Sequence, residues 1–145
     1  MSEITYLTKQ YKFCAAHRYW NDNWSDAKNF EVFGDDVKVH GHNYGLYITV
    51  FGQIDEHSGF ILNLSDLNSI VKENVLDVMD HSQIELDIPW FKSKQPSTEN
   101  MVVFIWNQLV SEIPAPAKLY SIKLRETPTI FSEYFGQKGG MRNEK

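Results

Sequence analysis

The stretch HGHNYGLYITVFGQ, residues 40–53, has the alternating pattern of one long β-strand. Successive side chains of a strand point to opposite faces, so every second residue shares a face. One face of this strand carries His40, His42, Tyr44, Leu46, Ile48 and Val50. Two histidines therefore lie side by side at the start of an otherwise aromatic and apolar face, and Gly41 between them lets another backbone approach closely.

Three other segments predict strands that can pair with this one. Residues 4–17 alternate in the same way, and one of their faces carries Tyr11, Phe13, Ala15 and His17. Two shorter strands are predicted at about 118–126 and 129–135, joined by the turn TPT at 127–129.

Helices are predicted between the two pairs of strands. Residues 63–81 repeat apolar side chains at helical spacing, and residues 97–110 do the same after Ser97 or Thr98 as the N-cap. A short helix is expected near Ser25–Phe33, inside the irregular excursion of residues 18–39. The order strand, strand, helix, helix, strand, strand predicts an α+β fold, a four-stranded antiparallel sheet with two helices on one face.

Length and composition narrow the class of protein. The 145 residues predict one domain, residues 1–136, and a polar, glycine-rich tail at 137–145 that we expect to be flexible. The formal charge of −5 argues against a nucleic-acid partner, because phosphates attract basic surfaces. No membrane span of ~20 apolar residues is present. The single cysteine, Cys14, excludes an intrachain disulfide and favours a cytoplasmic setting.

The two neighbouring histidines raise the possibility of a metal site. Catalytic zinc takes about three protein ligands and keeps one position open. His17 is the natural third ligand, because it ends the first strand and a hairpin brings its face to that of His40 and His42. From the spacing alone, packed or surface histidines explain such a pair more often than a metal does. HExxH, CxxC, GxGxxG and Walker motifs do not occur, so protease, thiol-redox and dinucleotide interpretations lack support.

Five short motifs occur in a fixed order: FCAAH (13–17), HGHNY (40–44), MDH (79–81), PSTEN (96–100) and RET (125–127). With these motifs the sequence resembles the zinc-dependent 6-pyruvoyltetrahydropterin synthase and 6-carboxytetrahydropterin synthase family over roughly residues 5–136. The resemblance implies Zn²⁺ at His17, His40 and His42. It also implies the tunnelling fold and a homo-oligomer, a trimer or hexamer built around a barrel, which agrees with the two open sheet edges.

The resemblance also implies a small-molecule substrate, 7,8-dihydroneopterin triphosphate. The pyruvoyl branch eliminates triphosphate and rearranges the side chain; the carboxy branch also loses acetaldehyde and leads toward 7-deazaguanine nucleosides such as queuosine. Asp80 and His81 match the family's Asp–His proton relay, which comes from a neighbouring subunit, although a helix cap explains them without that context. Glu126 matches the pterin anchor, and Thr98 matches a threonine that adds a contact or caps its helix.

The chain departs from the family at one position. Members carry a catalytic cysteine shortly before the HGH motif, and FGDDVKVHGH (33–42) has none. In the carboxy branch the cysteine lies four residues before the first histidine ligand, a position that Asp36 occupies here. In the pyruvoyl branch it lies six residues before, where this chain has Gly34. The FG at 33–34 resembles members with FG just ahead of the cysteine, which favours Asp36 as the equivalent position. Cys14 precedes His17 by three residues, so it points to the opposite face of the strand, and we expect it to be a buried structural thiol.

Three interpretations of this departure stay open. Asp36 can act as the proton-abstracting base, with Asp35 as a like charge beside it. An aldolase-like branch that forms 6-hydroxymethyl-dihydropterin uses a glutamate in this region, a part that Glu31 or Asp36 can take. The third is a catalytically silent pterin-binding module. The leading hypothesis is the lyase, with Asp36, Asp80 and His81 as catalytic residues, because a mere binder has no need of Asp80 and His81.

Overall fold

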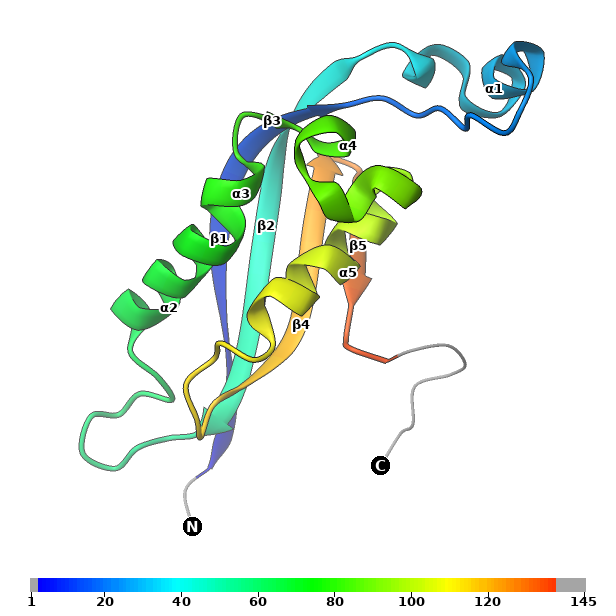
Figure 1. Ribbon diagram of the computed structural model, residues 1–145. Helices are drawn as coiled ribbons and strands as arrows, with labels where there is room; N and C mark the ends of the chain where they lie inside the picture. Colours follow the sequence, from blue (N-terminus) through cyan, green and yellow to red (C-terminus); the bar gives the residue numbers. More distant parts are fainter. Residues whose placement is uncertain (1–2, 138–145) are drawn as a thin grey trace.

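The computed structural model describes residues 3–137, a twisted sheet with helices on one face (Figure 1). Five strands follow the order β3-β1-β2-β4-β5. Their bounds are β1 Ile4–His17, β2 His40–Gln53, β3 Ser82–Gln83, β4 Lys118–Thr127 and β5 Ile130–Tyr134. The predicted α+β class and the four antiparallel strands are confirmed. The sheet has one strand more than predicted, because the two residues of β3 pair parallel with β1.

The strands β1 and β2, each of 14 residues, pair over their whole length. Ile4 lies opposite Gln53 at one end of this ribbon, and His17 lies opposite His40 at the other. Beyond the histidines the chain makes the excursion of residues 18–39, which lies past the end of the helical layer (Figure 1). The histidines therefore lie where the excursion joins the sheet.

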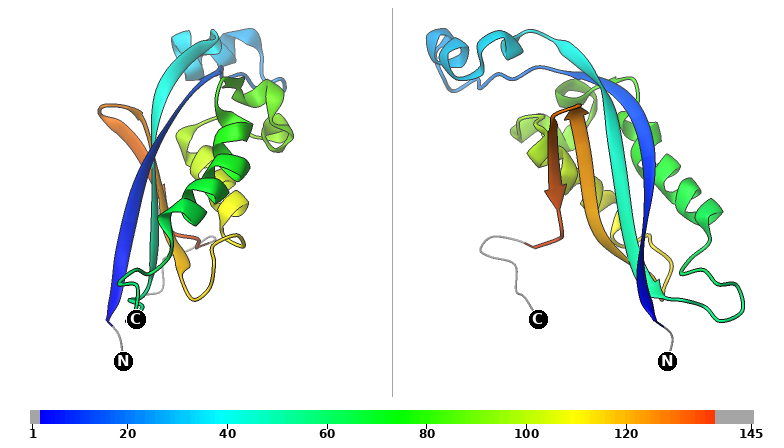
Figure 2. Two further views of the ribbon diagram at one scale, coloured as in Figure 1. Left: turned by 90° about the vertical axis from the view of Figure 1, so that its left-hand side faces the viewer. Right: turned by 180° about the vertical axis from the view of Figure 1, so that it is seen from behind.

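The helical segments from α2 to α5 cover a single face of the sheet, whereas α1 and η1 lie in the excursion beyond its end (Figure 2). Their bounds are α1 Asp26–Phe33, η1 Gly34–Val37, α2 Leu64–Val71, η2 Lys72–Leu76, α3 Asp77–Met79, α4 Ile84–Asp87, η3 Pro89–Ser93 and α5 Thr98–Leu109. The short first helix and the two long helical segments are confirmed. The segment predicted at 63–81 contains a π-helical turn, η2, between α2 and α3. The short elements α4 and η3 lie in a region to which the sequence assigned no structure.

The core lies between the sheet and these helices. Leu46, Ile48 and Val50 of β2 are fully buried, and the helices add Leu67, Val71, Val75, Met101, Ile105 and Leu109. Burying a side chain of this size contributes about 1.5–3 kcal/mol. Leu46, Ile48 and Val50 share a strand face with His42, so their burial fixes the direction in which His42 points.

The structure leaves some predictions about chain organisation open. Most of the tail predicted at 137–145 lies outside the described residues, and the domain limits 1–136 stay a prediction. Among residues 3–137, no helix has the length and apolar character that crossing a membrane requires.

Candidate active site

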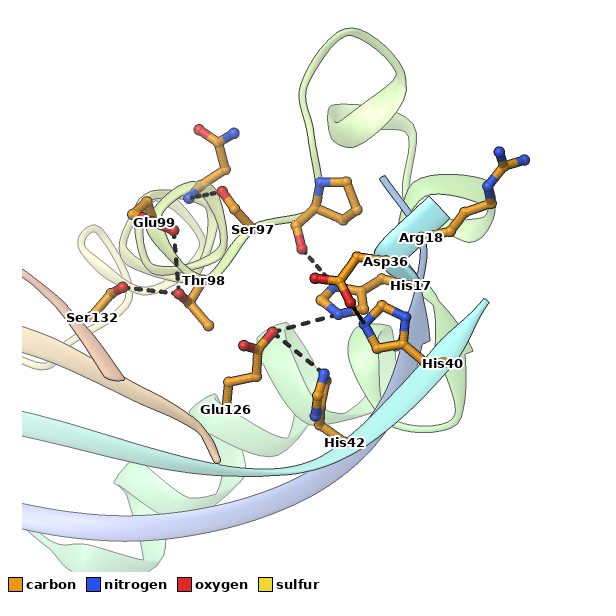
Figure 3. A network of polar contacts seen from close by, with 12 residues as sticks. His17, Arg18, Asp36, His40, His42, Ser97, Thr98, Glu99, Glu126 and Ser132 are labelled. Atoms are coloured by element: carbon orange, nitrogen blue, oxygen red, sulfur yellow. Dashed lines mark hydrogen bonds and ion pairs between the residues drawn. The ribbon is translucent and has the colours of Figure 1, made fainter. Parts of the chain in front are cut away.

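Three imidazoles meet at the end of the β1–β2 ribbon (Figure 3). His17 is the last residue of β1, and His40 and His42 begin β2 on the same face. One ring nitrogen from each of the three lies within 4.8 Å of the others. A Cβ at Gly41 would lie 3.3 Å from the Ala15 carbonyl oxygen, so the strands approach each other closely beside the histidines. The sequence predicted that the three imidazoles meet, and the strand register brings this about by placing His17 opposite His40.

Backbone carbonyls orient two of the rings. Nδ1 of His17 donates to the Pro96 carbonyl oxygen at 2.7 Å, and Nδ1 of His40 donates to the Lys38 carbonyl oxygen at 2.8 Å. A carbonyl can only accept, so each proton is on Nδ1 and the Nε2 lone pair is free for a ligand. Hydrogen bonds of this kind normally orient histidines that bind metals.

The inward nitrogens lack hydrogen-bond partners. Nε2 of His17 and Nε2 of His42 are buried and accept no hydrogen bond from the described residues. Burial lowers the pKa of His17 below its ordinary value, more than its hydrogen bond to Pro96 raises it, so the ring is neutral near pH 7. A buried polar atom without a partner costs about 1–3 kcal/mol. Neutral imidazole nitrogens that converge in this way fit a divalent metal ion.

Two carboxylates lie beside the histidines (Figure 3). Oε2 of Glu126, near the end of β4, lies 3.4 Å from Nε2 of His17 and 3.5 Å from Nε2 of His42. Oδ1 of Asp36, in η1, lies 3.8 Å from Nε2 of His40, and its side chain is 57% exposed. Glu31 is exposed on α1, and no ion pair within residues 3–137 joins it to the histidines. The negative charge of the two carboxylates favours a cation at this position.

Thr98 approaches the same region from the first turn of α5 (Figure 3). Its side chain is almost fully buried, and Oγ1 lies 2.9 Å from the Ser132 hydroxyl of β5. The N-cap of α5 is Ser97, whose hydroxyl accepts from the Asn100 amide, so Thr98 does not serve as the cap. Sequence reasoning missed Ser132 and the Pro96 carbonyl, because nothing in their local pattern indicates a long-range contact.

Asp80 and His81 form a second cluster with Cys14. Oδ2 of Asp80 lies 3.0 Å from Nδ1 of His81, and Oδ1 accepts the Cys14 amide at 2.9 Å. The Cys14 sulfur lies 3.8 Å from Nε2 of His81. Cys14 does point to the face opposite His17, as predicted, but the expectation of a buried structural thiol is wrong, because the residue is half-buried. The face of the sheet without helices leaves it accessible.

Two grooves adjoin each other near these clusters. One, of about 540 Å³, is lined by Gln10, Lys12, Tyr47, Arg125 and Glu126. The other, of about 360 Å³, is lined by Cys14, Ala16, His81 and Ser82. Gly41, His42 and Asn43 line both grooves. A larger cleft of about 700 Å³ is lined by Arg18, Lys92 and Lys94, and also by Val39 and Pro96, which adjoin the histidines. Volumes of 300–1,000 Å³ are typical of small-molecule sites.

The candidate site is thus a histidine cluster at the end of a long β-hairpin, on a sheet that helices cover on one face. The sequence model of 6-pyruvoyl tetrahydropterin synthase matches residues 6–137. The chain belongs to this family of enzymes, which are lyases.

Several relatives span most of the chain. The 6-pyruvoyl tetrahydrobiopterin synthase of Drosophila melanogaster is 36% identical over 135 residues, 92% of this chain and 80% of the relative. The 6-pyruvoyl tetrahydrobiopterin synthase of Homo sapiens is 34% identical over 133 residues, which are 90% of this chain and 91% of the relative. The 6-pyruvoyl tetrahydropterin synthase structure of Caenorhabditis elegans has a TM-score of 0.88 at 32% identity and covers 94% of this chain and 98% of its own.

The metal prediction is tested by elemental analysis of the purified full-length chain. We expect about one zinc ion per chain in the wild type and loss of that zinc in His42→Ala, because two imidazoles hold zinc poorly. His57→Ala is the matched control, since His57 lies in an exposed loop, and it should retain the metal. A wild type without stoichiometric metal, before and after titration with zinc, would contradict the assignment.

Proposed function

We propose that this chain is a zinc-dependent lyase that converts 7,8-dihydroneopterin triphosphate to a 6-substituted tetrahydropterin. The observation that carries the proposal is the convergence of Nε2 of His17 and His42, both buried and unpartnered, with a nitrogen of His40. Zinc suits three neutral nitrogen ligands and an open position. When bound, it would supply Lewis acidity to oxygens of the substrate side chain.

The 6-pyruvoyl product is favoured over the 6-carboxy product. Relatives named as 6-pyruvoyl tetrahydrobiopterin synthases are 34–36% identical over 90–94% of this chain. The 6-carboxy-5,6,7,8-tetrahydropterin synthase of Haemophilus influenzae is 33% identical and covers 70% of it. The position of Asp36 follows the carboxy-branch spacing, however, so the product assay below measures both products.

Glu126 is proposed as the anchor of the pterin ring. Its side chain is only 14% exposed and borders the groove of about 540 Å³. A carboxylate can accept two N–H hydrogen bonds from an aminopyrimidine edge, one on each oxygen. Thr98 is proposed to add a polar contact from the first turn of α5. This arrangement holds the pterin in the groove with its side chain toward the histidines.

Asp36 is proposed as the base that takes a proton from the substrate side chain. Its carboxylate lies beside His40, in the segment where the family carries cysteine. A solved Plasmodium vivax 6-pyruvoyltetrahydropterin synthase, 20% identical with a TM-score of 0.64, is a variant in which alanine replaces a catalytic glutamate. A carboxylate therefore serves catalysis in that protein. A carboxylate base at this position works without a thiol, so the missing cysteine is compatible with an active enzyme.

Asp80 and His81 are proposed as the proton relay. Within one chain they form a cluster of their own, separate from the three histidines. The family pattern is a relay that serves the zinc site of a neighbouring subunit, which requires a homo-oligomer, a trimer or hexamer. The open sheet edges fit such an assembly. The single cysteine fits a location in the cytoplasm.

A silent pterin-binding module is the second candidate, favoured by the absence of cysteine before the HGH motif. Incubation of the zinc-loaded protein with dihydroneopterin triphosphate, followed by chromatography, separates the two. We expect a tetrahydropterin product above the level of a zinc-stripped control. Dephosphorylated dihydroneopterin tests the aldolase branch in parallel, through release of glycolaldehyde. No product from either substrate would leave only the binding module.

Asp36→Ala should lower kcat by about 10²–10⁴-fold, the usual contribution of a general base, with pterin affinity unchanged. Asp26→Ala is the control, because Asp26 is an exposed aspartate in α1 of the same excursion. Steady-state kinetics and equilibrium binding measure the two effects. Equal kcat values for the wild type and Asp36→Ala would remove Asp36 from the mechanism.

Glu126→Gln should weaken pterin binding by about tenfold or more, because each hydrogen bond to a charged group contributes about 1.5–3 kcal/mol. The amide keeps the size of the side chain but replaces one acceptor with a donor. Glu133→Gln, an exposed change on β5, serves as the control. Pterin fluorescence titration gives the affinities, and an unaltered value for Glu126→Gln would count against the anchor role.

A further inference from the structure

The carboxylate of Glu126 reaches from β4 toward the histidines of both strands of the β1–β2 ribbon (Figure 3). Oε2 lies 3.4 Å from Nε2 of His17 and 3.5 Å from Nε2 of His42. Neither contact is a hydrogen bond, because both nitrogens lack a hydrogen-bond partner among the described residues. The β4–β5 register shifts between Arg125 and Thr127, and irregularities of this kind re-aim side chains beside active sites. The sheet itself therefore directs Glu126 toward the histidines.

The contact between Glu126 and His17 joins two acceptors. Nδ1 of His17 donates to the Pro96 carbonyl oxygen at 2.7 Å, so Nε2 of the neutral ring carries a lone pair. An ionised carboxylate offers lone pairs alone. His17 is fully buried and Glu126 nearly so, which leaves little water to screen the repulsion between the two groups. Their close approach therefore indicates that both are arranged around a cation.

The separations also match those between two ligands of one zinc ion. Zinc binds histidine nitrogen at about 2.0–2.1 Å and carboxylate oxygen at about 2.0–2.2 Å, usually in tetrahedral geometry. Two ligands at these distances and at the tetrahedral angle lie about 3.3–3.5 Å from each other. Oε2 of Glu126 meets this condition with both His17 and His42.

Asp36 is the other carboxylate beside the histidines, and it fits the position of a metal ligand less well. Its Oδ1 approaches a single nitrogen, Nε2 of His40, at 3.8 Å, and its side chain is exposed. Glu126 approaches two nitrogens and is largely buried, where the attraction between a carboxylate and a cation is stronger than in water. Glu126 is therefore the better candidate for a fourth ligand, which leaves Asp36 free for another role.

We propose that Glu126 is the fourth metal ligand of the substrate-free protein and leaves the metal when it binds the pterin. The second half of this proposal rests on the proposed function, in which the same carboxylate anchors the pterin ring. A carboxylate oxygen that binds the metal lies too close to the histidines to leave room for a bicyclic ring in between. The two positions of Glu126 therefore exclude each other, and the side chain must turn away from His17 and His42 to hold the ring.

This exchange couples recognition of the pterin to access to the metal. In the substrate-free protein Glu126 closes the fourth position, so a small anion from solution competes poorly for it. A bound pterin draws the carboxylate away and opens the position. By thermodynamic linkage, a pterin and a small anion at the metal should each bind more tightly in the presence of the other.

The cobalt-loaded, full-length protein tests the proposal without turnover, because the visible spectrum of Co²⁺ reports its ligands. The probes are azide, as the small anion, and a pterin without a side chain at C6. We expect saturating pterin to tighten azide binding to the wild type by about tenfold or more, within the usual range of coupling between two sites. Glu133→Gln, an exposed change on β5, should match the wild type.

Two variants of Glu126 separate ligation from charge. Glu126→Gln removes the charge, whereas Glu126→Asp keeps the charge on a side chain one methylene shorter. If Glu126 binds the metal, both variants should change the cobalt spectrum and bind azide about tenfold more tightly than the wild type, with no further gain from pterin. A Glu126→Asp protein with the wild-type spectrum and azide affinity would overturn the ligand role, because charge alone would then explain the effect of Glu126→Gln.

The remaining outcomes separate this proposal from the proposed function. Azide affinity of the wild type that does not respond to pterin would overturn the exchange. A wild type that binds no cobalt would overturn the metal site and the fourth ligand together. Coupled binding of azide and pterin that both Glu126 variants abolish, in a protein that forms no tetrahydropterin, would overturn the lyase and support the role of Glu126 at the metal.

Discussion

The pairing register of β1 with β2 is the constraint on which the site depends. Because side chains alternate along a strand, a slip of one residue would turn the face of β1 that carries His17 away from His40 and His42. The register is held by burial of Leu46 and Ile48 on β2, far from the chemistry. The hydrophobic core and the imidazole cluster are thus two ends of the same strand face, and the first determines the geometry of the second.

The site also carries an energetic cost that the protein alone does not recover. The buried Nε2 atoms of His17 and His42 have no hydrogen-bond partner among the described residues, and the hydrogen bond from Nδ1 to the Pro96 carbonyl prevents His17 from turning to find one. Groups that are oriented but unsatisfied are prepared for a ligand, since a bound cation replaces the missing interactions without reorganisation. Metal affinity and folding stability are therefore coupled in this protein.

Period-two alternation predicted β1 and β2 with their observed bounds, because one face of each strand is buried and the other is not. The same argument placed His17 with His40 and His42. It could not predict β3, which is two residues long and owes its existence to the turn at His81. Nor could it predict the Pro96 carbonyl contact, because a backbone group carries no sequence signal. Parity put Cys14 on the correct face, but burial of that face depends on whether a second layer covers it, which alternation does not reveal.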